Sequence, residues 1–388
     1  MFLYQCNLCN KTFKRDEVTY LCPECSKDYK SGEPLKGVLK VVFDYDYIKK
    51  HFDKNNPDWN LFSAVEKKYY PGIPVGSTPY YKLHNLSVKT GFKNIWLKND
   101  ALNPSGSLKD RASFLVVAEA NRLNINTIVT ASTGNAASAL ACISASAEKK
   151  AIIFVPSSAP KAKLVQMYLY GAEVIKVEGT YDDAFQLSLE YSEKNSCLNR
   201  NTAYHPLTIE GKKSAGLEIL FQNGYKVPDA ILVPVGDGVI ISGIYKAFYD
   251  LKMCGLADKL PKLICVQAEK SSAIHNFLTT GKYKNFQNPS TIADSISVST
   301  PSNAYMAKQA VEESRGFSVC VSDEEILEGQ KLLASTEGVF AEPAAASVIP
   351  ALQKIKSKNL LNENEHIVLL ITGNGLKDIE TAMRNIKT

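Results

Sequence analysis

A lysine follows a short polar turn in the stretch N-P-S-G-S-L-K-D-R, residues 103–111. Pro104 and Gly106 favour a tight turn, and Asp110 suits the first turn of a helix that begins close to Lys109. An ammonium group is disfavoured at the positive end of a helix dipole, so a lysine placed there gives up its proton more easily. Such an amine is a nucleophile for a carbonyl group. The stretch therefore makes Lys109 a candidate for covalent catalysis, with an ordinary surface lysine as the alternative.

Three further loops follow predicted buried strands, at the place where parallel sheets bind ligands. Residues 131–138 read A-S-T-G-N-A-A-S, and their amides at a helix start favour an anion. Residues 233–243 run from a strand into Gly-x-Gly and a helix, a pattern that can hold a phosphate. Residues 371–378 place the hydroxyl of Thr372 and two glycines at a strand end. Each loop alone also fits ordinary helix capping. Together they suggest one ligand with a phosphate, a ring and a carbonyl, and pyridoxal phosphate (PLP) has these parts.

Two C-x-x-C pairs stand in the first 25 residues, separated by twelve residues. This is the spacing of a zinc ribbon, in which two turns each present two thiolates to one ion. Such a site is closed, so the pattern predicts a structural zinc, with redox-active or vestigial thiols as the alternative. The predicted ligands are Cys6, Cys9, Cys22 and Cys25. The other five cysteines are scattered and indicate small buried side chains, not a disulfide framework.

The composition is that of an ordinary globular enzyme, with 45% hydrophobic and 22% charged residues in 388. This length suggests two domains with an appendage. The net charge of +5 comes from scattered lysines and arginines, so it does not argue for nucleic acid as a partner. No apolar run reaches the roughly 18 residues of a membrane span, and the N-terminus lacks the features of a signal peptide. We therefore expect a cytoplasmic protein with no membrane partner.

Strands and helices alternate along most of the chain. Continuous apolar runs predict strands at residues 38–42, 95–98, 127–131, 151–155, 173–177, 230–235, 263–267 and 367–371. Helical patterns are present at residues 108–123, 135–147, 160–170 and 182–194. Apolar strands separated by helices indicate parallel sheets covered on both faces. There are too many strands for one small sheet, so we expect an α/β protein with two such domains.

The motifs, in this order and spacing, resemble those of threonine synthases. They are L-N-P-S-G-S-L-K-D-R, S-T-G-N-A, V-P-V-G-D-G-V-I and L-L-I-T-G-N-G-L-K-D, together with I-E-G-K-K-S at 209–214 and F-A-E-P-A-A-A-S at 340–347. That family consists of PLP enzymes of fold type II, the tryptophan synthase β-subunit-like fold. The resemblance spans about residues 70–388. It implies two domains, each with a mainly parallel sheet flanked by helices, beside the small N-terminal ribbon.

The resemblance also implies roles for individual residues. Lys109 would hold PLP as a Schiff base and afterwards carry protons, and Asn135 would hydrogen-bond the phenolic oxygen of the ring. The hydroxyl of Thr372 would meet the pyridine nitrogen. The cofactor phosphate would be held at Gly236, Asp237, Gly238, Val239 and Ile240. The α-carboxylate of the substrate would be bound by Ser132, Thr133 and Gly134.

The implied reaction converts O-phospho-L-homoserine and water to L-threonine and phosphate. Ala136 and Thr208 stand where many relatives carry a threonine and an arginine that help to hold the substrate phosphate. Lys161, Lys163, Lys212, Lys213 or His205 could compensate. The alternative keeps PLP but changes the substrate, as in a serine/threonine ammonia-lyase or a cysteate synthase that uses phosphoserine. In a non-enzymatic alternative, the ribbon is the functional part of the protein, as a module that binds nucleic acid or protein, and the rest is a degenerate enzyme body.

The predicted domain organisation has three parts. A zinc-ribbon-like segment covers residues 1–36. The large PLP-binding domain comprises 37–113 and 201–388, and a small domain that closes on substrate comprises 114–200. We expect a small amino-acid substrate as the ligand and, from the resemblance, a homodimer.

Overall fold

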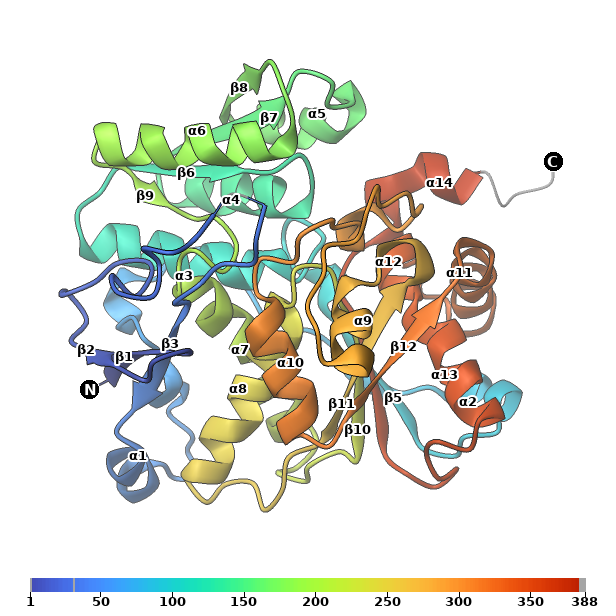
Figure 1. Ribbon diagram of the computed structural model, residues 1–388. Coiled ribbons are helices and arrows are strands. Elements are labelled where there is room, and N and C mark those ends of the chain that lie inside the picture. The colour runs from blue at the N-terminus through green and yellow to red at the C-terminus, as the bar shows by residue number, and fades with distance from the viewer. Residues whose placement is uncertain (1, 31, 384–388) are drawn as a thin grey trace. The chain divides into compact units, whose positions relative to one another are not determined.

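The computed structural model describes residues 2–30 and 32–383. The chain divides into two compact units. Unit 1 comprises residues 1–76 and 109–212, and unit 2 comprises residues 77–108 and 213–388 (Figure 1). None of the described helices combines the length and the apolar character that crossing a bilayer requires.

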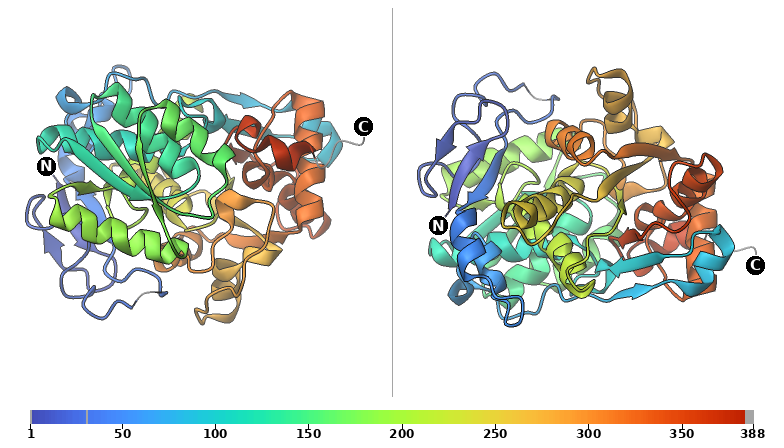
Figure 2. Two further views of the ribbon diagram at one scale, coloured as in Figure 1. Left: turned by 90° about the horizontal axis from the view of Figure 1, so that it is seen from above. Right: turned by 90° about the horizontal axis from the view of Figure 1, so that it is seen from below.

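A parallel sheet in the order β8-β7-β6-β9 lies at the centre of unit 1. One face packs its apolar side chains, among them Val129 and Phe154, against α6, and α4 lies on the other face and contacts α3 (Figure 2). The apolar runs of the sequence form these strands because both faces of the sheet are covered. The elements are α3 (Lys109–Arg122), β6 (Thr127–Ala131), α4 (Asn135–Ser146), β7 (Lys150–Pro156), α5 (Lys161–Leu169), β8 (Glu173–Val177), α6 (Tyr181–Lys194) and β9 (Leu198–Asn199).

The N-terminal part of unit 1 is a small antiparallel sheet in the order β2-β1-β3. Its strands are β1 (Phe2–Cys6), β2 (Thr12–Phe13) and β3 (Leu39–Phe43), and α1 (Tyr45–His51) follows. We call residues 2–43 the ribbon. Cys6 ends β1, and residues 7–38, which hold the other three cysteines of the two pairs, connect β1 to β3 by way of β2.

A six-stranded sheet in the order β12-β11-β10-β13-β5-β4 forms the centre of unit 2, and only its edge strand β4 is antiparallel. α13 packs on one face against the buried side chains of β10, β12 and β13, and α8 and α10 lie on the other (Figure 1). The strands are β4 (Tyr80–Lys82), β5 (Ile95–Asn99), β10 (Ala230–Pro234), β11 (Lys262–Ala268), β12 (Phe317–Val321) and β13 (Ile367–Ile371). The helices are α2 (His84–Thr90), α8 (Val239–Met253), α9 (Ala273–Thr280), α10 (Ala304–Glu313), α11 (Asp323–Glu337), α12 (Pro343–Ala346), α13 (Val348–Ser357) and α14 (Ile379–Met383), and α7 (Leu207–Gln222) begins in unit 1 and ends in unit 2.

The structure confirms the predicted fold class and each predicted strand and helix to within a few residues at its ends. Three strands of the two larger sheets were missing from the sequence expectations: β4, β9 and β12. The predicted domain boundaries differ from the two compact units, because residues 37–76, 109–113 and 201–212, which were predicted for the large domain, group with unit 1. The division into a large and a small closing domain stays a prediction.

Candidate active site and candidate metal centre

Lys109 is the first residue of α3, as the sequence predicts. The turn before it uses a left-handed residue, Gly106, whose φ is +84°. Backbone hydrogen bonds fix this turn to the loop after β13: the Leu108 amide donates to the Thr372 carbonyl at 2.9 Å, and the Asn374 amide donates to the Gly106 carbonyl at 2.9 Å. Because Lys109 follows Leu108 directly, its backbone leaves from the edge of the sheet at which β13 ends.

The candidate phosphate loop lies at that same edge. β10 and β13 are neighbouring parallel strands, with Leu232 opposite Leu369, so residues 235–240 emerge beside Thr372. Gly238, with a φ of +87°, is the N-cap of α8, and no side chain caps this helix start. A Cβ at Gly238 would lie 2.7 Å from the Ala307 side chain, so the loop tolerates no larger residue there. Uncapped amides at the start of a helix fit a phosphate group.

The carboxylate of Asp237 does not oppose this assignment. Its backbone carbonyl accepts a hydrogen bond from the Asn303 amide at 2.9 Å, and one carboxylate oxygen lies 3.4 Å from the Ser302 amide, which donates to it. Asn303 also donates from its side-chain amide to the Ser242 hydroxyl at 3.0 Å. The segment before α10 therefore holds the loop, and an amide of that segment partly balances the negative charge that a phosphate would otherwise meet.

The loop after β6 forms a second uncapped helix start, in unit 1. Gly134 is the N-cap of α4, no side chain caps the helix, and a Cβ on Gly134 would meet no atom within 4 Å. The Ser132 hydroxyl accepts from the Gly134 amide at 3.2 Å, and Asn135 is buried as the first residue of α4. Open space beside the amides and hydroxyls of a helix start fits a small carboxylate. The structure places Ser132, Thr133 and Gly134 directly before Asn135, the first residue of a helix that contacts the helix of Lys109.

Asn201 holds the end of β6, from which this loop begins, and nothing in the sequence indicated that role. Its fully buried side-chain oxygen accepts from the Ala131 amide at 2.8 Å and from the Thr130 hydroxyl at 3.1 Å, at the last two residues of β6. Its side-chain amide donates to the Ser188 hydroxyl of α6 at 2.7 Å. Asn201 follows the two-residue strand β9, which gives no recognisable pattern, so the sequence held no signal for this role.

Glu342, from the F-A-E-P-A-A-A-S motif, is a second residue of the site to which the sequence assigned no role. Its side chain is buried, accepts from the Ser295 hydroxyl at 3.2 Å, and lies against Gly373, the residue after Thr372. A Cβ on Gly373 would stand 2.2 Å from the Glu342 carboxylate. Glycine is therefore required beside the candidate partner of the ring nitrogen.

Substitution of this glycine tests the arrangement. Gly373→Ala should displace the Glu342 carboxylate and the Thr372 backbone, because a methyl group does not fit between them. We expect cofactor affinity to fall at least about tenfold, a change near 1.4 kcal/mol. Titration of apoprotein with PLP, followed by the absorbance of the bound cofactor, measures it. Equal affinity of Gly373→Ala and the parent protein would contradict this placement of Glu342.

Thr208, and two of the residues considered for the substrate phosphate, make other contacts. The Thr208 hydroxyl is buried and donates to the His205 carbonyl at 2.7 Å. The Lys213 ammonium is buried and donates to Asp250 at 3.1 Å. The imidazole of His205 is buried, and burial lowers its pKa to about 4, so it is neutral near pH 7. Lys161 and Lys163 remain exposed or half-buried in the first turn of α5.

The buried imidazole of His205 makes a pH-dependent contribution to stability. Its Nδ1 accepts from the Leu207 amide at 3.2 Å, and burial outweighs the opposing charge of Glu119 to lower the pKa from 6.5 to about 4. The unfolded chain binds the proton at a higher pH than the folded chain does, so stability falls as the pH drops from about 6.5 to about 4. The expected loss is roughly 3 kcal/mol.

The matched variant is His205→Asn, whose amide oxygen replaces the acceptor but does not titrate. Urea unfolding at pH 7 and at pH 4.5 should show a larger loss of stability in the parent protein than in His205→Asn. A parallel loss in both proteins would mean that His205 titrates normally in the folded state.

The four clustered cysteines form a candidate metal centre within the ribbon. Their sulfur atoms all lie within 4.8 Å of one another, with 3.7 Å between Cys6 and Cys25 and 3.8 Å between Cys9 and Cys22. A tetrahedral Zn²⁺ with bonds of about 2.3 Å sets its sulfurs about 3.8 Å apart. These separations fit one ion and are too long for disulfides. The Leu8 amide also donates to the Cys6 sulfur at 3.4 Å, a contact that supports a thiolate ligand.

Gly37 packs against the turn that holds Cys22 and Cys25. Its φ is +74°, its carbonyl accepts from the Cys22 amide at 2.8 Å, and a Cβ there would lie 3.0 Å from the Cβ atoms of both Cys22 and Cys25. The backbone therefore packs against the two ligands more closely than any residue but glycine permits.

Comparison with known proteins identifies the family to which the chain belongs. Residues 73–373 match the family described as pyridoxal-phosphate dependent enzyme. The threonine synthase of Methanocaldococcus jannaschii is 36% identical over an alignment that covers 98% of this chain and 94% of that protein. The threonine synthase of Methanosarcina acetivorans is also 36% identical, with 99% and 94% covered. Both alignments extend over nearly the whole chain.

Solved structures share the fold at lower identity. The processed form of threonine deaminase isoform 2 from Solanum lycopersicum has a TM-score of 0.69 at 23% identity and covers 80% of this chain and 87% of that chain. Maize serine racemase has a TM-score of 0.68 at 22% identity, with 80% and 92% covered. At this identity the likeness concerns the fold alone. The sequence relatives are more informative, and the chain therefore belongs to the pyridoxal-phosphate-dependent enzymes, in the branch that contains the curated threonine synthases.

Proposed function

We propose that this protein is a threonine synthase that converts O-phospho-L-homoserine and water to L-threonine and phosphate. The observation that carries the proposal is the 36% identity to archaeal threonine synthases over nearly the whole chain. The two uncapped helix starts give independent support, because the proposed ligands carry one phosphate on the cofactor and one α-carboxylate on the substrate. We infer a homodimer from the resemblance alone, and a cytoplasmic location remains the expectation from the sequence.

Several residues of this chain would act on the cofactor directly. When bound, PLP supplies the electron sink that stabilises a carbanion on the substrate. Lys109 would hold the cofactor covalently and then move protons with its Nζ. The hydroxyl of Thr372 would face the ring nitrogen, and Asn135 would donate to the phenolic oxygen.

The backbone of two loops would bind the two anions, the cofactor phosphate and the substrate α-carboxylate. The amides of residues 236–240 would hold the cofactor phosphate, and Ser132, Thr133 and Gly134 would orient the substrate through its α-carboxylate. Amides that the backbone of a helix start already orients need little reorganisation when an anion binds. The four cysteines would hold a structural Zn²⁺, because their sulfur separations match a tetrahedral ion.

A substrate panel tests the proposal. PLP-loaded protein should release phosphate from O-phospho-L-homoserine and form an equal amount of threonine. Ammonia released from threonine or serine, without phosphate release from phosphohomoserine, would support an ammonia-lyase instead. Cysteate formed from phosphoserine and sulfite would support a cysteate synthase. The visible absorbance of bound cofactor confirms in each assay that the protein is loaded.

A further inference from the structure

The loop between the two C-x-x-C pairs contacts the body of unit 1 at two places. Residues 10–21 carry Arg15, Asp16 and Tyr20, which reach α3 and β9. We propose that the ribbon positions two elements of the active site, the helix that begins at Lys109 and the loop 132–135, and that its metal ion holds it in place to do so. The inference rests on the proposed metal centre and on the proposed roles of these site residues.

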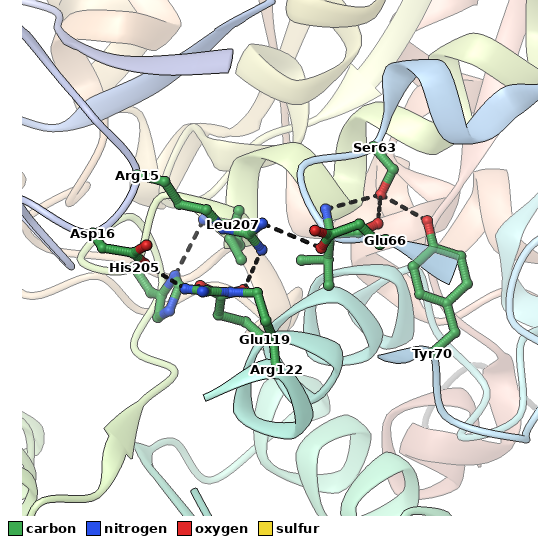
Figure 3. Close-up of polar contacts among 10 residues, drawn as sticks. Arg15, Asp16, Ser63, Glu66, Tyr70, Glu119, Arg122, His205 and Leu207 are labelled. Atoms are coloured by element: carbon green, nitrogen blue, oxygen red, sulfur yellow. Dashed lines mark hydrogen bonds and ion pairs between the residues drawn. The ribbon is translucent and has the colours of Figure 1, made fainter. Parts of the chain in front are cut away.

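The first contact is an ion-pair network on α3 (Figure 3). Arg15 donates to Glu119 at 2.6 Å and to Glu66 at 3.2 Å, and Arg122 donates to Glu119 at 2.7 and 2.9 Å and to Asp16 at 2.7 Å. The side chain of Glu119 is 6% exposed, whereas that of Asp16 is 70% exposed. The Arg15–Glu119 pair therefore dominates the contact, because exposed pairs contribute little.

Glu119 is charged in this network. Burial opposes its ionisation, but the hydrogen bonds and charges of Arg122 and Arg15 outweigh burial and hold its pKa below the ordinary value. Removal of Arg15 leaves one buried carboxylate with Arg122 as its remaining cation. The ribbon and α3 are thus joined by a desolvated charge pair, and loss of one partner is costly.

The second contact is a chain of hydrogen bonds that ends at the substrate loop. The Asn199 amide donates to the Tyr20 hydroxyl at 2.9 Å, and the Asn201 amide donates to the Asn199 side-chain oxygen at 2.8 Å. Asn201 in turn accepts from the Ala131 amide, one residue before Ser132. The ring of Tyr20 stacks on Tyr204 with centroids 4.4 Å apart. Tyr20 is therefore joined to the end of β6 through two buried asparagines.

Metal binding fixes both contacts because they lie between the ligands. Residues 10–21 form a loop that a tetrahedral ion closes at both ends, and a closed loop has less conformational freedom to lose on docking. Coupling of this kind is reciprocal. The metal should stabilise the docked ribbon, and docking should slow the loss of the metal.

Zinc release tests one direction of the coupling. Zinc-loaded full-length protein is mixed with excess chelator, and release is followed with a chromogenic zinc indicator. Arg15→Gln and Tyr20→Phe should each release zinc about tenfold faster than the parent protein, although neither residue is a ligand. Lys14→Gln removes the same charge at an exposed neighbouring position and should release zinc at the parental rate.

Hydrogen exchange tests the other direction. In Tyr20→Phe and in zinc-stripped protein, the amides of residues 127–135 and 199–201 should exchange about tenfold faster. Exchange in β10 and β13 of unit 2 should not change, whereas a general loss of stability would speed exchange there as well. Tyr20→Phe should also raise the KM for phosphohomoserine more than it lowers kcat, because it disturbs a loop that binds the carboxylate.

The outcomes separate this inference from the proposed function. Parental zinc release in both variants, or unchanged exchange at 127–135 after verified zinc removal, would show that the ribbon is an independent appendage. Purified protein that binds no zinc would also overturn the inference. A protein with coupled exchange but no phosphate release would keep the positioning role and reject the proposed reaction.

Discussion

Lys109→Ala should lose the visible absorbance of covalently bound cofactor and at least about 10³-fold in turnover, because no other group would replace the amine that holds PLP and carries protons. The structure supports this expectation through position. Lys109 begins α3, and the residue before it is hydrogen-bonded to Thr372. Absorbance spectra and phosphate release from purified, PLP-treated protein measure the two losses.

Two further variants give the control for this lysine. Lys109→Arg keeps the positive charge and the length, but a guanidinium remains protonated and forms no such linkage, so the absorbance should again be lost. Lys331→Ala removes an exposed lysine on α11 and should leave the spectrum unchanged. Retention of the parental spectrum by both Lys109 variants would show that another amine binds the cofactor.

Gly211→Ala should strongly destabilise unit 1 and reduce cofactor occupancy. Gly211 lies in α7, and a Cβ there would stand 2.2 Å from the Arg111 carbonyl oxygen and 2.7 Å from the Ala112 Cα. These are backbone atoms in the first turn of α3, two and three residues after Lys109, so no side chain can turn aside to relieve the clash. Alanine in a helix normally gains about 1 kcal/mol over glycine, but the forced shift of two helices should produce a net loss of about 2 kcal/mol or more.

Gly72→Ala is the matched control for this substitution. Gly72 belongs to the same unit, has no atom within 4 Å of its Cβ position, and does not adopt a left-handed conformation. Its unfolding midpoint in urea should equal or slightly exceed that of the parent protein. If Gly211→Ala unfolds at the same urea concentration as Gly72→Ala, the two helices do not meet as closely as the structure describes.

The central strands could be predicted from the sequence because they are buried on both faces. β6 and β13 begin and end at the predicted residues, since each is a short, mostly apolar run whose residues are almost all buried. β12, with the sequence F-S-V-C-V, lies at an edge of its sheet and alternates apolar with small polar residues, so its run is broken. β4 and β9 have three and two residues, too few for any periodic pattern.

Some residues of the candidate site can likewise be identified from local sequence, whereas others depend on contacts between distant segments. Lys109, Asn135, Gly238 and Thr372 stand in loops that directly follow strands or open helices, so local sequence identifies them. Asn201 acts through contacts that join β6 and α6 to a segment more than ten residues away. No local pattern encodes such a contact, because it depends on which strands become neighbours in the sheet.

The glycines of two motifs illustrate what the structure adds. I-E-G-K-K-S contains Gly211 because α3 and α7 pack backbone against backbone, and I-T-G-N-G contains Gly373 because the Glu342 carboxylate occupies the space of a side chain. The sequence marks both positions as glycine. Only the packing explains why no larger residue fits.

Isotope incorporation tests the proposed reaction most directly. PLP-loaded protein is supplied with O-phospho-L-homoserine in H₂¹⁸O, and both products are analysed by mass spectrometry. A threonine synthase should form threonine with one ¹⁸O in its hydroxyl group and phosphate without ¹⁸O, because the carbon–oxygen bond is broken and water adds to carbon. Homoserine with unlabelled oxygen and phosphate carrying ¹⁸O would show simple phosphate-ester hydrolysis and would contradict the proposed threonine synthase.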